Sequence, residues 1–63
     1  MLSLRAARVN AGYTQKRAAE LVGVNVSTLI KWENGVTYPT VILFKRLCEL
    51  YSVSVNDIFL KEA

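Results

Sequence analysis

Two helical segments of this sequence are separated by only three residues, Gly23 to Asn25. The first segment covers Gln15 to Val22, and Thr14 before it suits a helix N-cap. The second covers Val26 to Asn34, and the asparagine that ends the link suits the same role there. Gly35 follows, and glycine tolerates the left-handed backbone found just after a helix. Because the link is so short, the two helices must cross steeply.

The residues around this link are those that a steep crossing needs. Ala19 is small enough to let the two helices approach closely, and Gly23 can adopt the left-handed conformation of the turn. Leu29 and Trp32 share one face of the second helix because of their spacing. The expected apolar seam consists of Val22, Val24, Leu29 and Trp32. The pattern predicts a helix-turn-helix whose second helix is held against the body and presents its other face outward.

The rest of the chain predicts three further helices. The first runs from about Ser3 to Ala11, and Gly12 suits the position after its end. The stretch VTYPT is a loop, because its proline pushes the preceding residue towards extended geometry. Thr40 opens a helix that reaches about Tyr51, with apolar residues at steps of three and four. Ser54-Val55-Asn56-Asp57 resembles a capping box and starts a fifth helix.

One segment also fits a strand. The stretch YSVSV alternates at period two, which is typical of a strand. A lone strand has no expected partner in this chain, so a loop followed by a helix cap is the preferred interpretation. The expected fold class is all-α, a compact domain of five helices.

Length and composition restrict how such a domain is stabilised. The 63 residues form a single domain, residues 1–63, and a chain this short buries only about 60% of its extended surface. Cys48 is the single cysteine and histidine is absent, so we expect no disulfide, no metal site and no cofactor. A dense apolar core and oligomerisation are the remaining ways to stabilise the domain, and the 52% hydrophobic content suits both. We expect Cys48 to pack in that core.

The same composition argues against export and against catalysis. No apolar run approaches the roughly 18 residues of a membrane span. Arginines interrupt the segment MLSLRAARVN, where a signal peptide needs its apolar core. We therefore expect a cytoplasmic protein with a reduced thiol. Without histidine, a cysteine dyad or a glycine-rich phosphate loop, an enzyme is not expected.

Positive charge is concentrated in the first half of the chain. Residues 1–31 contain five basic residues and one acidic residue, a net charge of +4, whereas residues 32–63 carry a net charge of −1. A basic half on so small a domain fits a polyanionic partner such as nucleic acid. An ordinary solvated surface accounts for the charge equally well.

The stretch TQKRAAELVGVNVSTLIKWENG resembles the helix-turn-helix of the lambda-repressor/Cro-like family, also called Xre-type transcriptional regulators. RVNAG ahead of it is similar to the end of that family's first helix, and YPTVILFKRLCELYSVSVNDIFL is similar to its fourth and fifth helices. The resemblance covers about Leu4 to Leu60. It implies a DNA-binding domain of a transcriptional regulator, with double-stranded DNA as its partner.

The resemblance also implies roles for individual residues. Gln15 matches a phosphate-binding position at the start of the second helix, where free backbone N–H groups favour an anion. Arg8 and Glu33 match a structural ion pair, although Arg8 also suits a free phosphate contact. The positions facing base edges are Val26, Ser27 and Lys31, with Ile30 beside them. Thr28 and Asn34 match positions near the DNA backbone, and Lys16 beside Gln15 is a further expected phosphate contact.

The sequence departs from the family pattern at three places. Family members often carry a basic residue in the loop after the third helix, but VTYPT has none, so phosphate contacts there are expected from backbone N–H groups, Thr37 or Tyr38. Ala18 stands where leucine is usual, which predicts an underfilled seam. Leu21 stands where a polar residue is common; it either touches a partner or is an ordinary exposed apolar residue.

The base-facing residues predict weak specificity for one copy of the domain. Lys31 can bond guanine O6 and N7, and Val26 or Ile30 can meet a thymine methyl. A good bidentate pair is worth about 1–3 kcal/mol, so one such face is too little to select a genomic site. We therefore expect a homodimer and a two-fold operator with half-sites about 34 Å apart. The dimer surface is expected at Val55, Phe59 and Leu60, unless these residues only close the monomer core.

The sequence is consistent with two classes of function. The first is a sequence-specific DNA-binding regulator, most simply a repressor. The second is an antitoxin-type or accessory module that binds a protein through the same face. The apolar residues Val26 and Ile30 on that face support this hypothesis. A salt titration separates them, because DNA binding weakens with salt and an apolar contact responds little.

Overall fold

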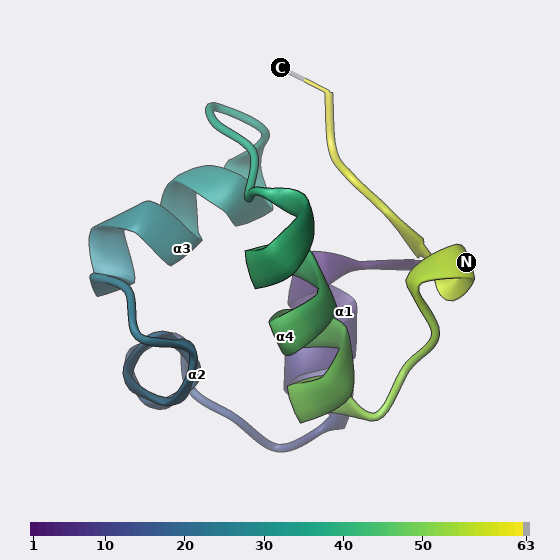
Figure 1. Cartoon of the computed structure of the whole chain (residues 1–63), viewed down its shortest axis with the longest axis horizontal. Coiled ribbons are helices and arrows are strands. Elements are labelled where there is room, and N and C mark those ends of the chain that lie inside the picture. Colours follow the sequence, from purple (N-terminus) through teal and green to yellow (C-terminus); the bar gives the residue numbers. More distant parts are fainter. Residues whose placement is uncertain (63) are drawn as a thin grey trace.

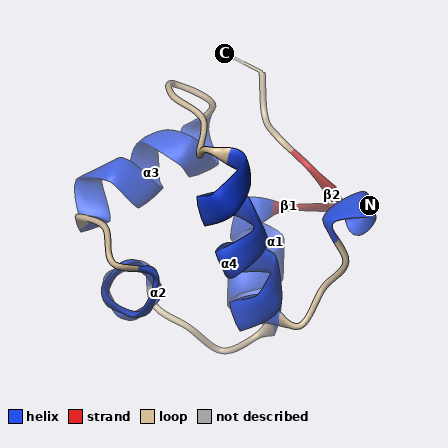
Figure 2. Ribbon diagram, in the orientation of Figure 1, coloured by secondary structure: helices blue, strands red, loops and turns tan. Residues whose placement is uncertain are grey.

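A computed structural model describes residues 1–62 as one small helical body, 25 × 25 × 20 Å (Figure 1). Four α-helices make up most of this part of the chain. Two short strands and one 3-10 turn complete it (Figure 2). In chain order the elements are β1 Leu2–Ser3, α1 Leu4–Asn10, α2 Gln15–Val22, α3 Val26–Asn34, α4 Val41–Tyr51, the 3-10 turn η1 Val55–Asp57 and β2 Ile58–Phe59.

The helix ends follow the capping residues of the sequence. Thr14 accepts a hydrogen bond from the Arg17 N–H at 3.1 Å and so caps α2. Thr40 caps α4 by accepting from the Leu43 N–H at 3.3 Å. The predicted bounds of α2 and α3 are confirmed. Helix α1 begins one residue later and ends one residue earlier than predicted, and α4 begins one residue later.

The prediction of a fifth α-helix is wrong. Residues Val55–Asp57 form a single 3-10 turn, which Ser54 caps by accepting from the Asn56 N–H at 3.3 Å. Ile58–Phe59 is then a strand that pairs in parallel with Leu2–Ser3. The extended N-terminal residues lie alongside and supply backbone partners. A β-branched residue followed by an aromatic one favours the strand that this pairing offers.

The prediction of a loop after α4 is confirmed. Ser52 ends α4 in the left-handed conformation with a φ of 57°, and the two residues after it belong to no helix or strand. The period-two pattern of YSVSV therefore reflects no strand. It combines the buried end of a helix, at Tyr51, with a helix-like cap at Ser54.

The core lies where α2 meets α3 and α4. Leu29 of α3 and Leu47 of α4 are fully buried, and Ala18 and Ala19 of α2 are buried beside them. Small residues at both positions allow α2 to pack closely against α3 and α4. Cys48 is part of this core, and burial raises the pKa of its thiol. No helix within residues 1–62 is both long enough and apolar enough to span a bilayer.

Candidate nucleic-acid interface

The link between α2 and α3 forms a tight turn. Gly23 has a φ of 91°, and the N–H groups of Gly23 and Val24 both donate to the Ala19 carbonyl, at 2.9 and 3.0 Å. Figure 1 looks along the axis of α2 while α3 runs across the view, so the helices cross steeply. The buried side chains of Leu29 and Trp32 hold α3 against the rest of the domain. This arrangement leaves one long side of α3 free.

The outward side of α3 carries most of the residues expected to face DNA bases. Val26 is 40% exposed, and Ser27 and Lys31 are also exposed. Ile30 is only partly exposed, so it has less surface to offer a partner than the sequence suggests. No carboxylate of residues 1–62 pairs with Lys31. The surface therefore combines an unpaired positive charge, a hydroxyl and an apolar side chain.

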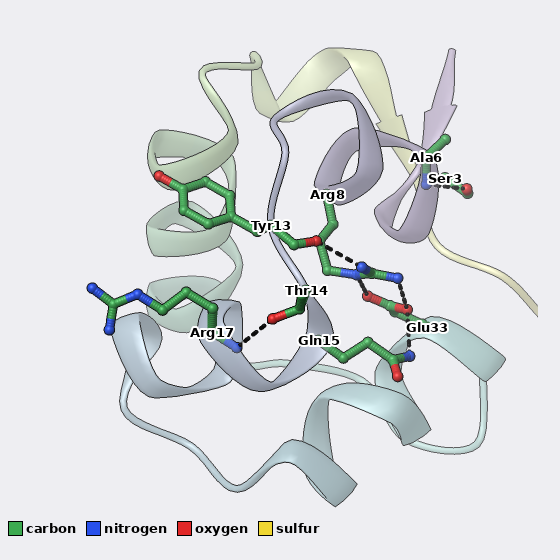
Figure 3. Close-up of polar contacts among 8 residues, drawn as sticks. All are labelled: Ser3, Ala6, Arg8, Tyr13, Thr14, Gln15, Arg17 and Glu33. Carbon is green, nitrogen blue, oxygen red and sulfur yellow. Dashed lines mark hydrogen bonds and ion pairs between the residues drawn. The ribbon is translucent and has the colours of Figure 1, made fainter.

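A buried ion pair fixes the far end of α3. Arg8 Nε lies 2.8 Å from Glu33 Oε2, and Arg8 Nη2 lies 3.4 Å from Glu33 Oε1 (Figure 3). Arg8 Nη1 also donates to the Tyr13 carbonyl at 2.8 Å. The ion pair expected from the sequence is therefore present. Arg8 is buried and each of its three guanidinium nitrogens already donates a hydrogen bond, which argues against the alternative of a free phosphate contact.

The same carboxylate also holds the first residue of α2. Gln15 Nε2 donates to Glu33 Oε1 at 3.0 Å, as Figure 3 shows. An amide nitrogen has two hydrogens, so one remains for another acceptor while this bond is kept. The N–H groups of Gln15 and Lys16 precede the first hydrogen bonds within α2. The N-terminus of α2 is therefore suitable for a phosphate, because it combines the positive end of the helix dipole, the free N–H groups and the charge of the Lys16 side chain.

The link between Gln15 and Glu33 was not anticipated from the sequence. The two residues lie 18 positions apart and on different helices. No periodic pattern relates them, because their meeting depends on the angle of the helix crossing. A glutamine at the first position of one helix and a glutamate in the last turn of the next are the only signals that the sequence offers.

The loop between α3 and α4 offers fewer phosphate donors than the sequence suggests. The N–H groups of Val36 and Thr37 both donate to the Lys31 carbonyl, at 2.9 and 3.4 Å. Tyr38 donates its hydroxyl hydrogen to the Lys61 carbonyl, at 3.1 Å. The Thr37 side chain is exposed, and its hydroxyl has no partner within residues 1–62. The free donors of this loop are therefore few.

The remaining expected contact residues differ in exposure. Asn34 and Lys16 are exposed, whereas Thr28 is partly buried. Of the residues expected in a dimer surface, Val55 is 40% and Phe59 is 45% exposed. The third, Leu60, packs against the core, so part of that surface closes the monomer instead.

Comparison with known proteins agrees with this geometry. A protein-family model described as "Helix-turn-helix" matches residues 4–58. The chain is also similar to "Uncharacterized HTH-type transcriptional regulator YgzD" of Bacillus subtilis (strain 168). The two are 33% identical over 52 residues, which cover 82% of this chain and 79% of the relative. No solved structure matches the chain.

Proposed function

Because this chain belongs to the helix-turn-helix family of transcriptional regulators, we propose that it binds a specific double-stranded DNA sequence and represses transcription in the cytoplasm. Membership of this family supports DNA binding in transcription regulation as the general function. The identity of the contact residues, the repressor role and the homodimer are our proposals. Repression needs only occupancy of a promoter, so it requires no further activity from a domain of this size.

The outward face of α3 is the observation that carries the proposal. Leu29 and Trp32 are buried, while Ser27 and Lys31 on the opposite side are exposed and unpaired within residues 1–62. A major groove about 12 Å wide accepts one α-helix. In this arrangement Lys31 bonds guanine, Ser27 serves more than one base, and Val26 contacts a thymine methyl. Ile30 contributes the part of its side chain that is accessible.

Phosphate contacts fix the register of the helix in the groove. The start of α2 provides the principal contact, through Gln15 with its second amide hydrogen and through Lys16. Glu33 does not repel the DNA, because Arg8 neutralises it and both are buried. The supporting backbone contacts come from Thr28, Asn34 and Thr37, whereas the Tyr38 hydroxyl already donates its hydrogen to the Lys61 carbonyl.

We propose a homodimer as the DNA-binding form. One copy presents a single lysine and a few apolar atoms to the bases, which is too little to select one site. The exposed side chains of Val55 and Phe59, with the accessible part of Leu60, are the proposed dimer surface. Two copies related by a two-fold axis read half-sites about 34 Å apart.

Selection of bound sequences from a random DNA pool tests the proposal. We expect the natural chain to enrich a motif with two-fold symmetry. Lys31→Ala should change the bases enriched within each half-site. Lys45→Ala removes the same charge from α4, which packs against α1, α2 and η1, and it should leave the motif unaltered. A pool without any enriched motif contradicts sequence-specific binding, and an unchanged motif for Lys31→Ala contradicts the assigned base contact.

A protein-binding module is the second candidate, and the exposed apolar side chains favour it. Val26 is 40% and Leu21 is 45% exposed, and both belong to the two helices of the motif. A salt titration decides between the two functions. Binding to DNA should weaken with a logarithmic slope of about −0.9 for each neutralised phosphate, whereas an apolar protein contact should change little with salt.

A further inference from the structure

The last described residues return to the end of α3. After β2 the chain leaves the sheet and runs towards the loop between α3 and α4 (Figure 1). We call residues 60–62 the C-terminal strap. The Tyr38 hydroxyl donates to the Lys61 carbonyl at 3.1 Å, across 23 residues of sequence. The strap is therefore attached to the loop that follows α3.

A second contact places the strap at the same point. Gly35 ends α3 with a φ of 75° and is buried. A Cβ atom on Gly35 would overlap the Lys61 carbonyl oxygen and would lie 3.2 Å from the Glu62 carbonyl carbon. The strap therefore lies directly against the C-terminal end of α3, in the space that a larger residue would fill.

The loop beside the strap has no charge of its own. Residues 36–40 contain neither a basic nor an acidic side chain. The N–H groups of Val36 and Thr37 are directed to the Lys31 carbonyl, so they are not free for a phosphate. Lys61 is exposed, and no carboxylate within residues 1–62 lies within 4.0 Å of its ammonium group. The strap thus brings an unpaired cation to the uncharged loop that follows α3, the proposed DNA-reading helix.

We propose that Lys61 binds a DNA phosphate beside the C-terminal end of α3, supplying from the strap the charge that the loop lacks. The inference rests on the proposed DNA-binding function. Phosphates border both sides of the groove that α3 would occupy, and a lysine neutralises one as a point charge. A phosphate contact adds affinity without adding sequence preference.

Tyr38 has a positioning role in this arrangement. Its hydroxyl has one hydrogen, and the Lys61 carbonyl accepts it. A phosphate oxygen only accepts hydrogen bonds, so Tyr38 has no donor for DNA while the strap is docked. It acts on DNA through Lys61, by keeping the strap at the loop.

A salt titration on a selected DNA duplex tests the role of Lys61. We expect Lys61→Ala to weaken binding on all sequences alike and to reduce the salt slope by about 0.9. Lys45→Ala is the matched control, because it removes the same formal charge from an exposed position on α4. It should keep the slope of the natural chain. Glu62 stays in place in both variants, so the local negative charge is constant.

The outcomes separate this inference from the proposed function. If the natural chain binds DNA with a salt-dependent affinity and Lys61→Ala has the same slope, Lys61 makes no phosphate contact and the inference is overturned. Equal losses for Lys61→Ala and Lys45→Ala also overturn it, because the effect is then one of net charge. If the natural chain itself shows no salt-dependent DNA binding, the proposed function fails first.

A double-mutant cycle tests the positioning role of Tyr38. Tyr38→Phe should weaken DNA binding in the natural chain and should have no further effect in Lys61→Ala. Equal effects in both backgrounds would show that Tyr38 acts on DNA independently of Lys61, which contradicts the positioning role. Both side chains are exposed, so each variant should still unfold in one cooperative transition with at most a small decrease in its midpoint, which serves as the folding control.

Discussion

Arg8 and Glu33 form a buried, two-bond ion pair that joins α1 to the last turn of α3. The same carboxylate receives the amide of Gln15 from the first residue of α2. Glu33 of α3, the proposed reading helix, is therefore joined to both α1 and α2. Any change in this carboxylate should affect both stability and the orientation of α3.

Removing one partner of this pair should be strongly destabilising. Glu33→Ala leaves the Arg8 guanidinium buried without a counter-charge, which typically costs about 3–5 kcal/mol. Replacing both partners together, as Arg8→Met with Glu33→Leu, should cost much less, because no buried charge remains. The free energy of unfolding in urea measures both effects.

The exposed pair Arg17–Glu20 is the control for this prediction. Its atoms lie 3.3 Å apart, but both side chains are more than half exposed. We expect Glu20→Ala to cost at most about 1 kcal/mol. A Glu33→Ala variant as mild as Glu20→Ala would contradict the importance of the buried pair.

The glycines that end α2 and α3 should respond differently to a methyl group. Both have a left-handed backbone, with φ of 91° at Gly23 and 75° at Gly35, so alanine should cost about 1–2 kcal/mol at each. A methyl at Gly23 meets nothing within 4 Å, whereas one at Gly35 collides with Lys61. Gly35→Ala should therefore reduce the free energy of unfolding further than Gly23→Ala. Equal losses would argue that the strap is not packed against α3.

The N-caps of α2 and α3 should also differ in importance. Thr14 accepts a hydrogen bond from the Arg17 N–H, but the Asn25 side chain makes no cap bond. Thr14→Ala should cost about 1 kcal/mol, and Asn25→Ala should cost clearly less. Thermal unfolding of the two variants checks this order, and the reverse order would contradict the capping geometry.

Tyr51 should make the domain sensitive to alkali. Burial, followed by the negative charge of Glu33, raises the pKa of Tyr51 from 10 to about 12. The unfolded chain then loses this proton at a lower pH than the folded chain. Ionisation of Tyr51 therefore does not lower the free energy of unfolding below pH 10. Between pH 10 and about pH 12 it lowers this free energy by roughly 2 kcal/mol.

Tyr51→Phe is the matched variant for this pH dependence. The Tyr51 hydroxyl is buried without a hydrogen-bond partner in residues 1–62, so its removal should leave stability at neutral pH unchanged or slightly increased. The difference in unfolding free energy between the variant and the natural chain should then widen above pH 10. A constant difference across this range would contradict a raised pKa at Tyr51.

Local signals were enough to place the four helices. A hydroxyl at Thr14 or Thr40 satisfies N–H groups within the next turn, and Gly23 and Gly35 permit a left-handed backbone that few other residues adopt. These effects act over three or four residues, so the sequence alone places the ends of the four helices to within one residue. The helical spacing of Leu29 and Trp32 likewise determines which face of α3 is buried.

Only the tertiary structure decided which distant segments meet. The strand Ile58–Phe59 exists because Leu2–Ser3 lies beside it, whereas the local pattern of Ser54 to Asp57 by itself predicts a helix. The hydrogen bonds from Gln15 to Glu33 and from Tyr38 to Lys61 likewise join residues that are far apart in the sequence. Each depends on the angle between packed helices or on the path of the chain, which buried contacts across the whole domain determine together. The proposed reading face was thus a property of the sequence, whereas its supports, and the lysine placed beside it, are properties of the fold.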